Sequence, residues 1–116
     1  MRTIRRLILA TIVLSAPALT AAADGFNDYP TAARADYVFA CMQANQQTRQ
    51  VLEQCSCSID VVASIIPYDR YVEAETVLSV AQVAGPVGAQ FRSTEQSRDL
   101  VRDLRRAQAE AEVRCF

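Results

Sequence analysis

Residues 53–75 read EQCSCSIDVVASIIPYDRYVEAE, and this stretch decides the fold. Two cysteines separated by one residue lie near its start, and an apolar run follows them. Pro67 separates that run from a segment dense in carboxylates and phenols. Apolar residues recur at helical spacing on both sides of the proline. Because the residue before a proline avoids the α-helical conformation, the stretch predicts two helices that meet at Pro67.

One further helix is expected on each side of this stretch. The earlier helix begins at Thr31 or the turn before it, and it fades in the polar connector at residues 44–48. The later helix begins at a capping box, Ser93-Thr94-Glu95-Gln96. Its apolar residues follow at steps of four, three, four and four as far as Cys115, with charged residues on the other faces. These are the outer two of four short helices.

The ends of the two central helices can also be predicted. Thr48 is the expected N-cap of the first and Asp69 that of the second, while Gly85 and Pro86 break the second helix. The polar residues 24–30 are expected to form a flexible lead-in. The sequence therefore predicts an all-α domain of four short helices in a small, disulfide-stapled bundle.

Residues 1–23 have the pattern of an export signal. A basic start (MRTIRR) is followed by an apolar segment and by small residues that end in Ala21-Ala22-Ala23, which predicts cleavage before Asp24. An uncleaved membrane anchor is the alternative, but the apolar segment is shorter than the ~20 residues of a membrane-spanning helix. We therefore expect a periplasmic protein with one domain at residues 24–116 and no membrane attachment after cleavage.

Cleavage at this point makes the protein acidic. Of twelve arginines, Arg2, Arg5 and Arg6 leave with the signal, so nine face thirteen acidic residues and the net charge is near −4. The chain has neither lysine nor histidine. Nucleic acids and anionic lipids need a cationic surface, so neither is an expected partner, whereas a cation is.

The four cysteines predict two disulfides, because an even number in a small exported domain is typical of covalent cross-links. A redox-active Cys55 would need a nearby cation or helix N-terminus, yet its charged neighbour is Glu53. A zinc site of four thiols is disfavoured in an oxidising compartment. Side chains two residues apart on a helix diverge by about 200°, so Cys41 pairs with Cys55 or Cys57 and Cys115 with the other. We favour Cys41–Cys55 with Cys57–Cys115, and the swapped pairing stays open.

Four carboxylates around Pro67 form a candidate metal site. They are Asp60, Asp69, Glu73 and Glu75. If the helices fold back on each other at Pro67, these acids converge with Glu73 at their centre, and Arg70 is the one base between residues 53 and 75. Several anionic oxygens suit a hard cation. The alternative is that Asp69 caps a helix and the glutamates are solvated.

Catalysis is not expected from this composition. The chain has no histidine, no lysine and no G-x-S-x-G or glycine-rich phosphate motif. A small helical domain also offers no evident cleft in which paired acids would cleave a sugar. Tyr68 and Tyr71 are expected to pack as aromatic side chains rather than to surround a metal ion.

Three segments resemble a known family: FACMQANQ at 39–46, CSCSIDVVAS at 55–64 and PYDRYVEAETVLSV at 67–80. They are similar to the landiscernin-like small periplasmic proteins associated with lanthanide-dependent methanol dehydrogenases. The likeness covers residues 37–92. It implies a periplasmic metallochaperone that binds a light, trivalent lanthanide ion, forms a homodimer on binding, and serves a quinoprotein alcohol dehydrogenase system.

A different class of function remains open. A metal-free helical domain with disulfides also suits a protein-interaction module, whose partner in this setting is a periplasmic dehydrogenase or cytochrome. The two hypotheses differ in whether the carboxylates around Pro67 take up a trivalent cation.

Overall fold

The computed structural model describes residues 28–116, which form five helices and no strand. The helices are α1 (Thr31–Ala44), α2 (Arg49–Ile65), α3 (Tyr68–Ala81), α4 (Pro86–Ser93) and α5 (Glu95–Cys115). The all-α prediction is confirmed, and the predicted number of four helices is wrong by one. The predicted signal peptide, residues 1–23, lies outside the described residues.

The helix that the sequence missed is α4. It starts with Pro86, whose missing N–H costs nothing at the first position of a helix. Gly85, before it, has φ 94°, a conformation that glycine adopts without strain. Helix α3 ends at Ala81, before the predicted break at Gly85 and Pro86, and the chain starts a new helix at Pro86.

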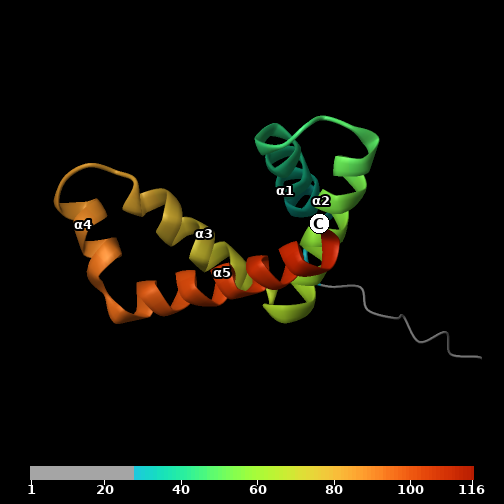
Figure 1. The fold of residues 1–116 in the computed structure, drawn as a ribbon. Coiled ribbons are helices and arrows are strands. Elements are labelled where there is room, and N and C mark those ends of the chain that lie inside the picture. Colours follow the sequence, from blue (N-terminus) through green and yellow to red (C-terminus); the bar gives the residue numbers. More distant parts are fainter. Residues whose placement is uncertain (1–27) are drawn as a thin grey trace, which may run out of the picture.

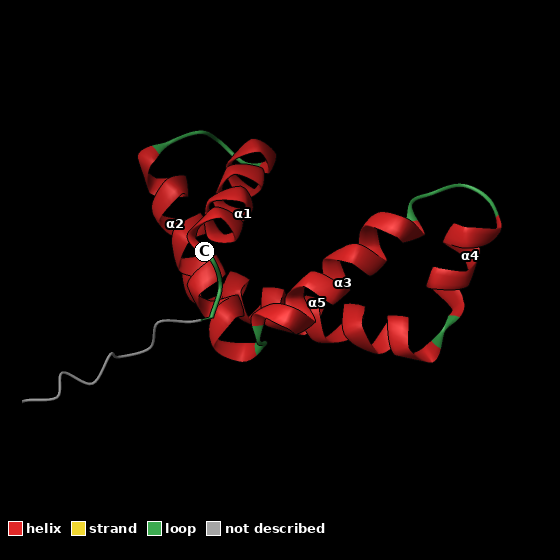
Figure 2. Ribbon diagram, turned by 180° about the vertical axis from the view of Figure 1, so that it is seen from behind, coloured by secondary structure: helices red, strands yellow, loops and turns green. Residues whose placement is uncertain are grey.

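Helix α5 is the longest of the described helices, and α2, α3 and α4 each pack against it (Figure 1). Its C-terminal half packs against α2, and α1 packs on α2 beside it. Its N-terminal half packs against α3, while α4 closes the far end between them. The view from behind shows the same two groups of helices (Figure 2). We call α3, α4 and the first part of α5, residues 68–106, the arm.

One hydrophobic core runs along α5. Its buried members are Tyr29, Ile59, Val62, Ile66, Ala74, Val77, Leu100, Leu104, Ala107 and Ala111. The apolar stripe predicted for the last helix is confirmed, since all four of its aliphatic residues are buried. The two alanines near the C-terminus let α2 approach α5 closely, whereas each large aliphatic residue that is fully buried contributes about 1.5–3 kcal/mol.

The favoured disulfide pairing is confirmed. Cys41 is bonded to Cys55 and Cys57 to Cys115, with Cα–Cα distances of 5.9 and 5.8 Å, inside the usual range of about 4.4–6.8 Å. The first bond joins α1 to α2, and the second joins α2 to the end of α5. The first matters most to α1, because that helix has no fully buried residue of its own.

The segment before α1 is not a flexible lead-in over residues 28–30. Tyr29 is 5% exposed, and its hydroxyl donates a hydrogen bond to the carbonyl of Ile66 at 3.1 Å. The Asp28 carboxylate accepts the N–H of Tyr68 at 2.8 Å. Asp28 therefore satisfies the N-terminus of α3, and the prediction that Asp69 is its N-cap is wrong.

The other caps follow the sequence within one residue. Thr48 accepts the N–H of Val51 and caps α2, as predicted. At α5 the N-cap is Thr94, which accepts the N–H of Ser97 at 3.2 Å. The predicted capping box is therefore wrong in register, because Ser93 is the last residue of α4. No helix within residues 28–116 is long and apolar enough to span a membrane.

Candidate functional site

Two of the four predicted metal ligands have other partners. The Asp60 carboxylate on α2 lies 2.7 Å from the guanidinium of Arg34 on α1, in a partly exposed ion pair. Asp69 lies in the first turn of α3, where its carboxylate accepts the N–H of Arg70 at 2.8 Å. Both acids therefore stabilise local structure.

The two glutamates of α3 face different neighbours. They are two residues apart, so their side chains diverge by about 200° around the helix. Glu73 lines a pocket with residues of α4 and α5, including Gln90 and Gln96. Glu75 lines another pocket with residues of α1. The structure does not bring the four predicted ligands together, and no three Asp, Glu, His or Cys side chains within residues 28–116 form a group that fits a metal ion.

The pocket at Glu75 has two carboxylates in its lining, and we call it the acidic pocket. Its volume is about 510 Å³, and it lies between α1, α3 and α5. Its lining comprises Asp36, Tyr37, Ala40, Cys41, Tyr71, Glu75 and Gln108. It therefore offers two carboxylates, two phenols and one amide as polar groups.

Burial alters the proton affinities in the acidic pocket. The Glu75 residue is largely exposed, but partial desolvation of its carboxyl raises the pKa of Glu75. Burial also raises the pKa of the Tyr71 phenol, and the nearby charge of Glu75 raises it further. Tyr71 therefore stays protonated at neutral pH, and its hydroxyl is available to donate a hydrogen bond. No described base forms an ion pair with Asp36 or Glu75.

The tyrosines near Pro67 pack as aromatic side chains, as the sequence predicts. The rings of Tyr68 and Tyr71 are stacked with centroids 6.3 Å apart, and each lies 5.1 Å from the ring of Tyr29. The three rings fix the start of α3 against the segment that precedes α1. Tyr71 thus belongs both to this cluster and to the acidic pocket.

The largest concavity that we find lies on the arm, and we call it the arginine groove. Its volume is about 720 Å³. Its apolar floor consists of Val77, Leu78, Ala81, Phe91 and Val101. Its rim carries five arginines, Arg92, Arg98, Arg102, Arg105 and Arg106. Ser97 completes the lining.

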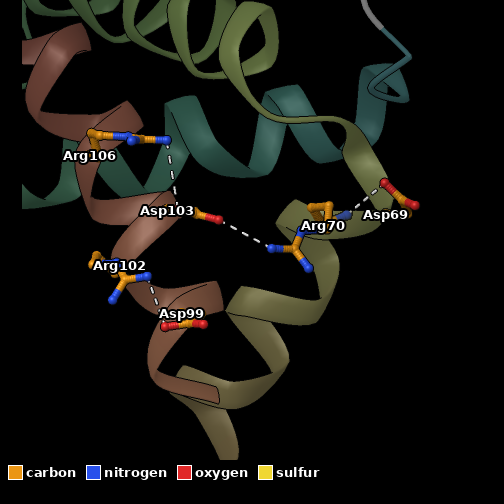
Figure 3. A network of polar contacts seen from close by, with 6 residues as sticks. All are labelled: Asp69, Arg70, Asp99, Arg102, Asp103 and Arg106. Carbon is orange, nitrogen blue, oxygen red and sulfur yellow. Dashed lines mark hydrogen bonds and ion pairs between the residues drawn. The ribbon is translucent and has the colours of Figure 1, made fainter. Parts of the chain in front are cut away.

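Acids of the arm neutralise part of this rim (Figure 3). Arg102 pairs with Asp99 at 2.9 Å, and Arg106 lies 3.8 Å from Asp103. The Asp103 carboxylate also accepts a hydrogen bond from the Arg70 guanidinium at 3.2 Å, and this contact joins α3 to α5. The network in Figure 3 therefore holds the two long helices of the arm together and orients two of the rim arginines.

The remaining rim arginines leave the groove positively charged. Arg92 donates to the carbonyl of Ala81 at the end of α3, and this bond neutralises no charge. Arg98 and Arg105 form no ion pair with any residue of the described chain. An apolar floor beneath unpaired guanidinium groups suits an anionic ligand that also has apolar side chains or segments.

From the sequence alone, the rim arginines of the last helix were expected only as part of its charged faces. Their spacing contains the signal that was missed: Arg98, Arg102, Arg105 and Arg106 follow at steps of four, three and one, which places them on neighbouring positions of one helix face. Arg92 has no such signal, because it joins the groove through α4, which was not predicted.

Comparison with protein-family models, with curated proteins and with solved structures finds no match to this chain. Its function must therefore be inferred from the arginine groove and the acidic pocket themselves.

Proposed function

We propose that this chain is an exported, non-catalytic binding module that docks a partner protein on its arm. The observation that carries the proposal is the arginine groove, in which five cationic side chains surround an apolar floor. Arginine and aromatic residues are enriched at the centres of protein interfaces, and the groove supplies both through its rim and Phe91. Binding through arginine and apolar side chains requires neither a nucleophile nor a general base, so the proposed function is not catalytic.

The covalent structure supports the export part of the proposal. All four cysteines are in disulfides, which persist in oxidising compartments such as the periplasm. The signal-like residues 1–23 agree with this location. A dehydrogenase or cytochrome of a quinoprotein alcohol dehydrogenase system is the partner that the family resemblance implies.

Capture of the partner tests this function. The mature chain, residues 24–116, is immobilised and exposed to a periplasmic extract of its host, beside two variants. The groove variant is Arg98→Glu with Arg105→Glu. The control variant is Arg49→Glu with Arg114→Glu, which changes the net charge equally at exposed ion pairs outside the arm.

We expect the wild-type chain and the control variant to recover the same protein, and the groove variant to recover at least about tenfold less, because reversed charges repel an acidic partner. Circular dichroism checks that all three chains are folded. Equal recovery by all three, or recovery of no protein by the wild type, contradicts the proposal.

A second candidate function, lanthanide binding coupled to dimerisation, is favoured by the acidic pocket. Trivalent lanthanides are hard cations that take more oxygen ligands than the 6–8 of calcium. One chain offers Asp36, Glu75 and two phenols there, too few for such an ion. Two copies that bring their acidic pockets together would double the number of carboxylates, and the ion would then favour the dimer by mass action.

A further inference from the structure

No helix of residues 28–116 covers the groove between α3 and α5. Helices α3 and α5 lie side by side along the arm, whereas α4 contacts them at the far end only (Figures 1 and 2). As a result Leu78, Phe91 and Val101 on the groove floor are only partly buried. Two packed helices with an open apolar groove between them present the surface on which a third helix packs.

The rim arginines of α5 extend over enough helical turns to contact a helical ligand along one side. From Arg98 to Arg106 the rise along α5 is about 12 Å at 1.5 Å per residue, which is just over two turns. Arg92 on α4 extends the cationic rim toward the other end of the groove. A ligand that pairs with this rim needs several acids spaced along one side, as a helix provides at i, i+4 and i+7.

A second copy of this chain does not suit the groove in a twofold-symmetric contact. A twofold-symmetric contact places the same patch of each subunit against itself, so the rim arginines of one copy would face those of the other. Arg98 and Arg105, without ion pairs of their own, would then repel across a poorly solvated interface. Charge complementarity instead requires an acidic occupant.

We propose that the arginine groove binds an amphipathic α-helix of a partner protein, with apolar residues against Leu78, Phe91 and Val101 and with acidic residues toward Arg98 and Arg105. This inference rests on the proposed function, since it identifies the chemistry of the partner. Pairs formed at the exposed rim steer association and set orientation, while the apolar floor supplies most of the affinity.

Synthetic peptides test the chemistry without the natural partner. The first is an amphipathic peptide of about 20 residues, because shorter helices are marginal in water, with leucine on one face and glutamate on the others. A second peptide has lysine in place of glutamate. A third has the composition of the first in scrambled order. Fluorescence anisotropy measures binding to the mature chain, and circular dichroism measures helix formation.

We expect the glutamate peptide to bind at least about tenfold more tightly than the other two and to gain helix on binding. The groove variant should lose at least about tenfold in affinity, whereas the control variant should stay within about twofold of the wild type. Binding should also weaken with salt, because the rim is exposed and its charges are screened.

Several results would overturn the inference: equal binding of the glutamate and lysine peptides, binding without gain of helix, or equal affinity of the groove and control variants. Groove-dependent binding to vesicles of anionic lipid, in place of the peptide, would assign the site to a membrane. Groove-dependent dimerisation in sedimentation would assign it to a second copy. If capture of the natural partner depends on the groove but the glutamate peptide does not bind, the proposed function stands and the helix inference fails.

Discussion

Glu73 and Glu75 of α3 are two residues apart and line two different pockets. Glu73 turns toward α4 and α5, and Glu75 turns toward Asp36 on α1. The sequence placed Glu73 at the centre of a metal site, whereas Glu75 is the glutamate that lines the acidic pocket. The difference matters because partial desolvation raises the pKa of Glu75, so that protons compete more strongly with a cation for its carboxylate.

Lanthanide titration therefore has a specific expected outcome at the residue scale. If the acidic pocket binds trivalent neodymium, Glu75→Gln should weaken the affinity at least about tenfold. Glu53→Gln, an exposed acid on α2, should change it by less than about twofold. Because partial burial raises the pKa of Glu75 and protons compete with the metal, affinity should rise as the pH increases through that pKa.

Calorimetry at several pH values measures these constants, and sedimentation with and without neodymium measures dimerisation. Unchanged affinity in a chain that carries both Glu75→Gln and Asp36→Asn would place any metal site elsewhere. Absence of binding to the wild type would remove the lanthanide function and leave the protein-binding proposal unaffected.

At the scale of helices, the two disulfides contribute differently. Cys57–Cys115 closes a loop of 58 residues and Cys41–Cys55 one of 14. The chain-entropy model gives about 4 kcal/mol for the longer loop and about 3 kcal/mol for the shorter. The pair Cys57→Ala and Cys115→Ala should therefore destabilise the whole fold more than the pair Cys41→Ala and Cys55→Ala.

Removal of Cys41–Cys55 should also have a local effect. Helix α1 has no fully buried residue, and its remaining ties to α2 include the Tyr37–Ser58 hydrogen bond and the Arg34–Asp60 ion pair. We expect its amides to exchange faster in that variant while α5 keeps its protection. Urea unfolding and hydrogen exchange measure the two effects. A larger loss of stability from the shorter loop would contradict this account.

The elements that the sequence predicted well are those with strong periodicity. Leu100, Leu104 and Ala107 recur at helical steps between charged residues, so one face of α5 is unambiguous before any contact is known. The favoured disulfide pairing is the one in the structure, although the sequence alone left the swapped pairing open.

Elements that depend on distant contacts were missed. Helix α4 has only eight residues, and Gly88 packs so close to the Val83 carbonyl that a Cβ would clash. Tyr29 lies in a polar segment that gives no sign of its burial. The metal cluster was predicted on the premise that the helices on either side of Pro67 fold back on each other. In the structure α2 and α3 each pack against α5 instead, and Asp60 pairs with Arg34 of α1. The groove needs α4 and α5 together, so no single segment reveals it.

On the scale of the whole molecule, the chain divides its tasks between two ends of α5. Disulfides stabilise the end formed by α1 and α2, while the arm presents an apolar floor and unpaired arginines. The two disulfides stabilise the α1–α2 end whether or not a partner is bound. Under the proposed function, the exposed apolar surface of the arm serves to bind the partner.

Hydrogen exchange of the mature chain, alone and with the partner that it captures, shows whether the arginine groove of the arm is the docking surface. The account predicts slower exchange on binding at residues 77–81, 91–92 and 98–106, which line the groove, and unchanged exchange at residues 31–44. Protection confined to α1 and α2, or no protection on the arm, would contradict it.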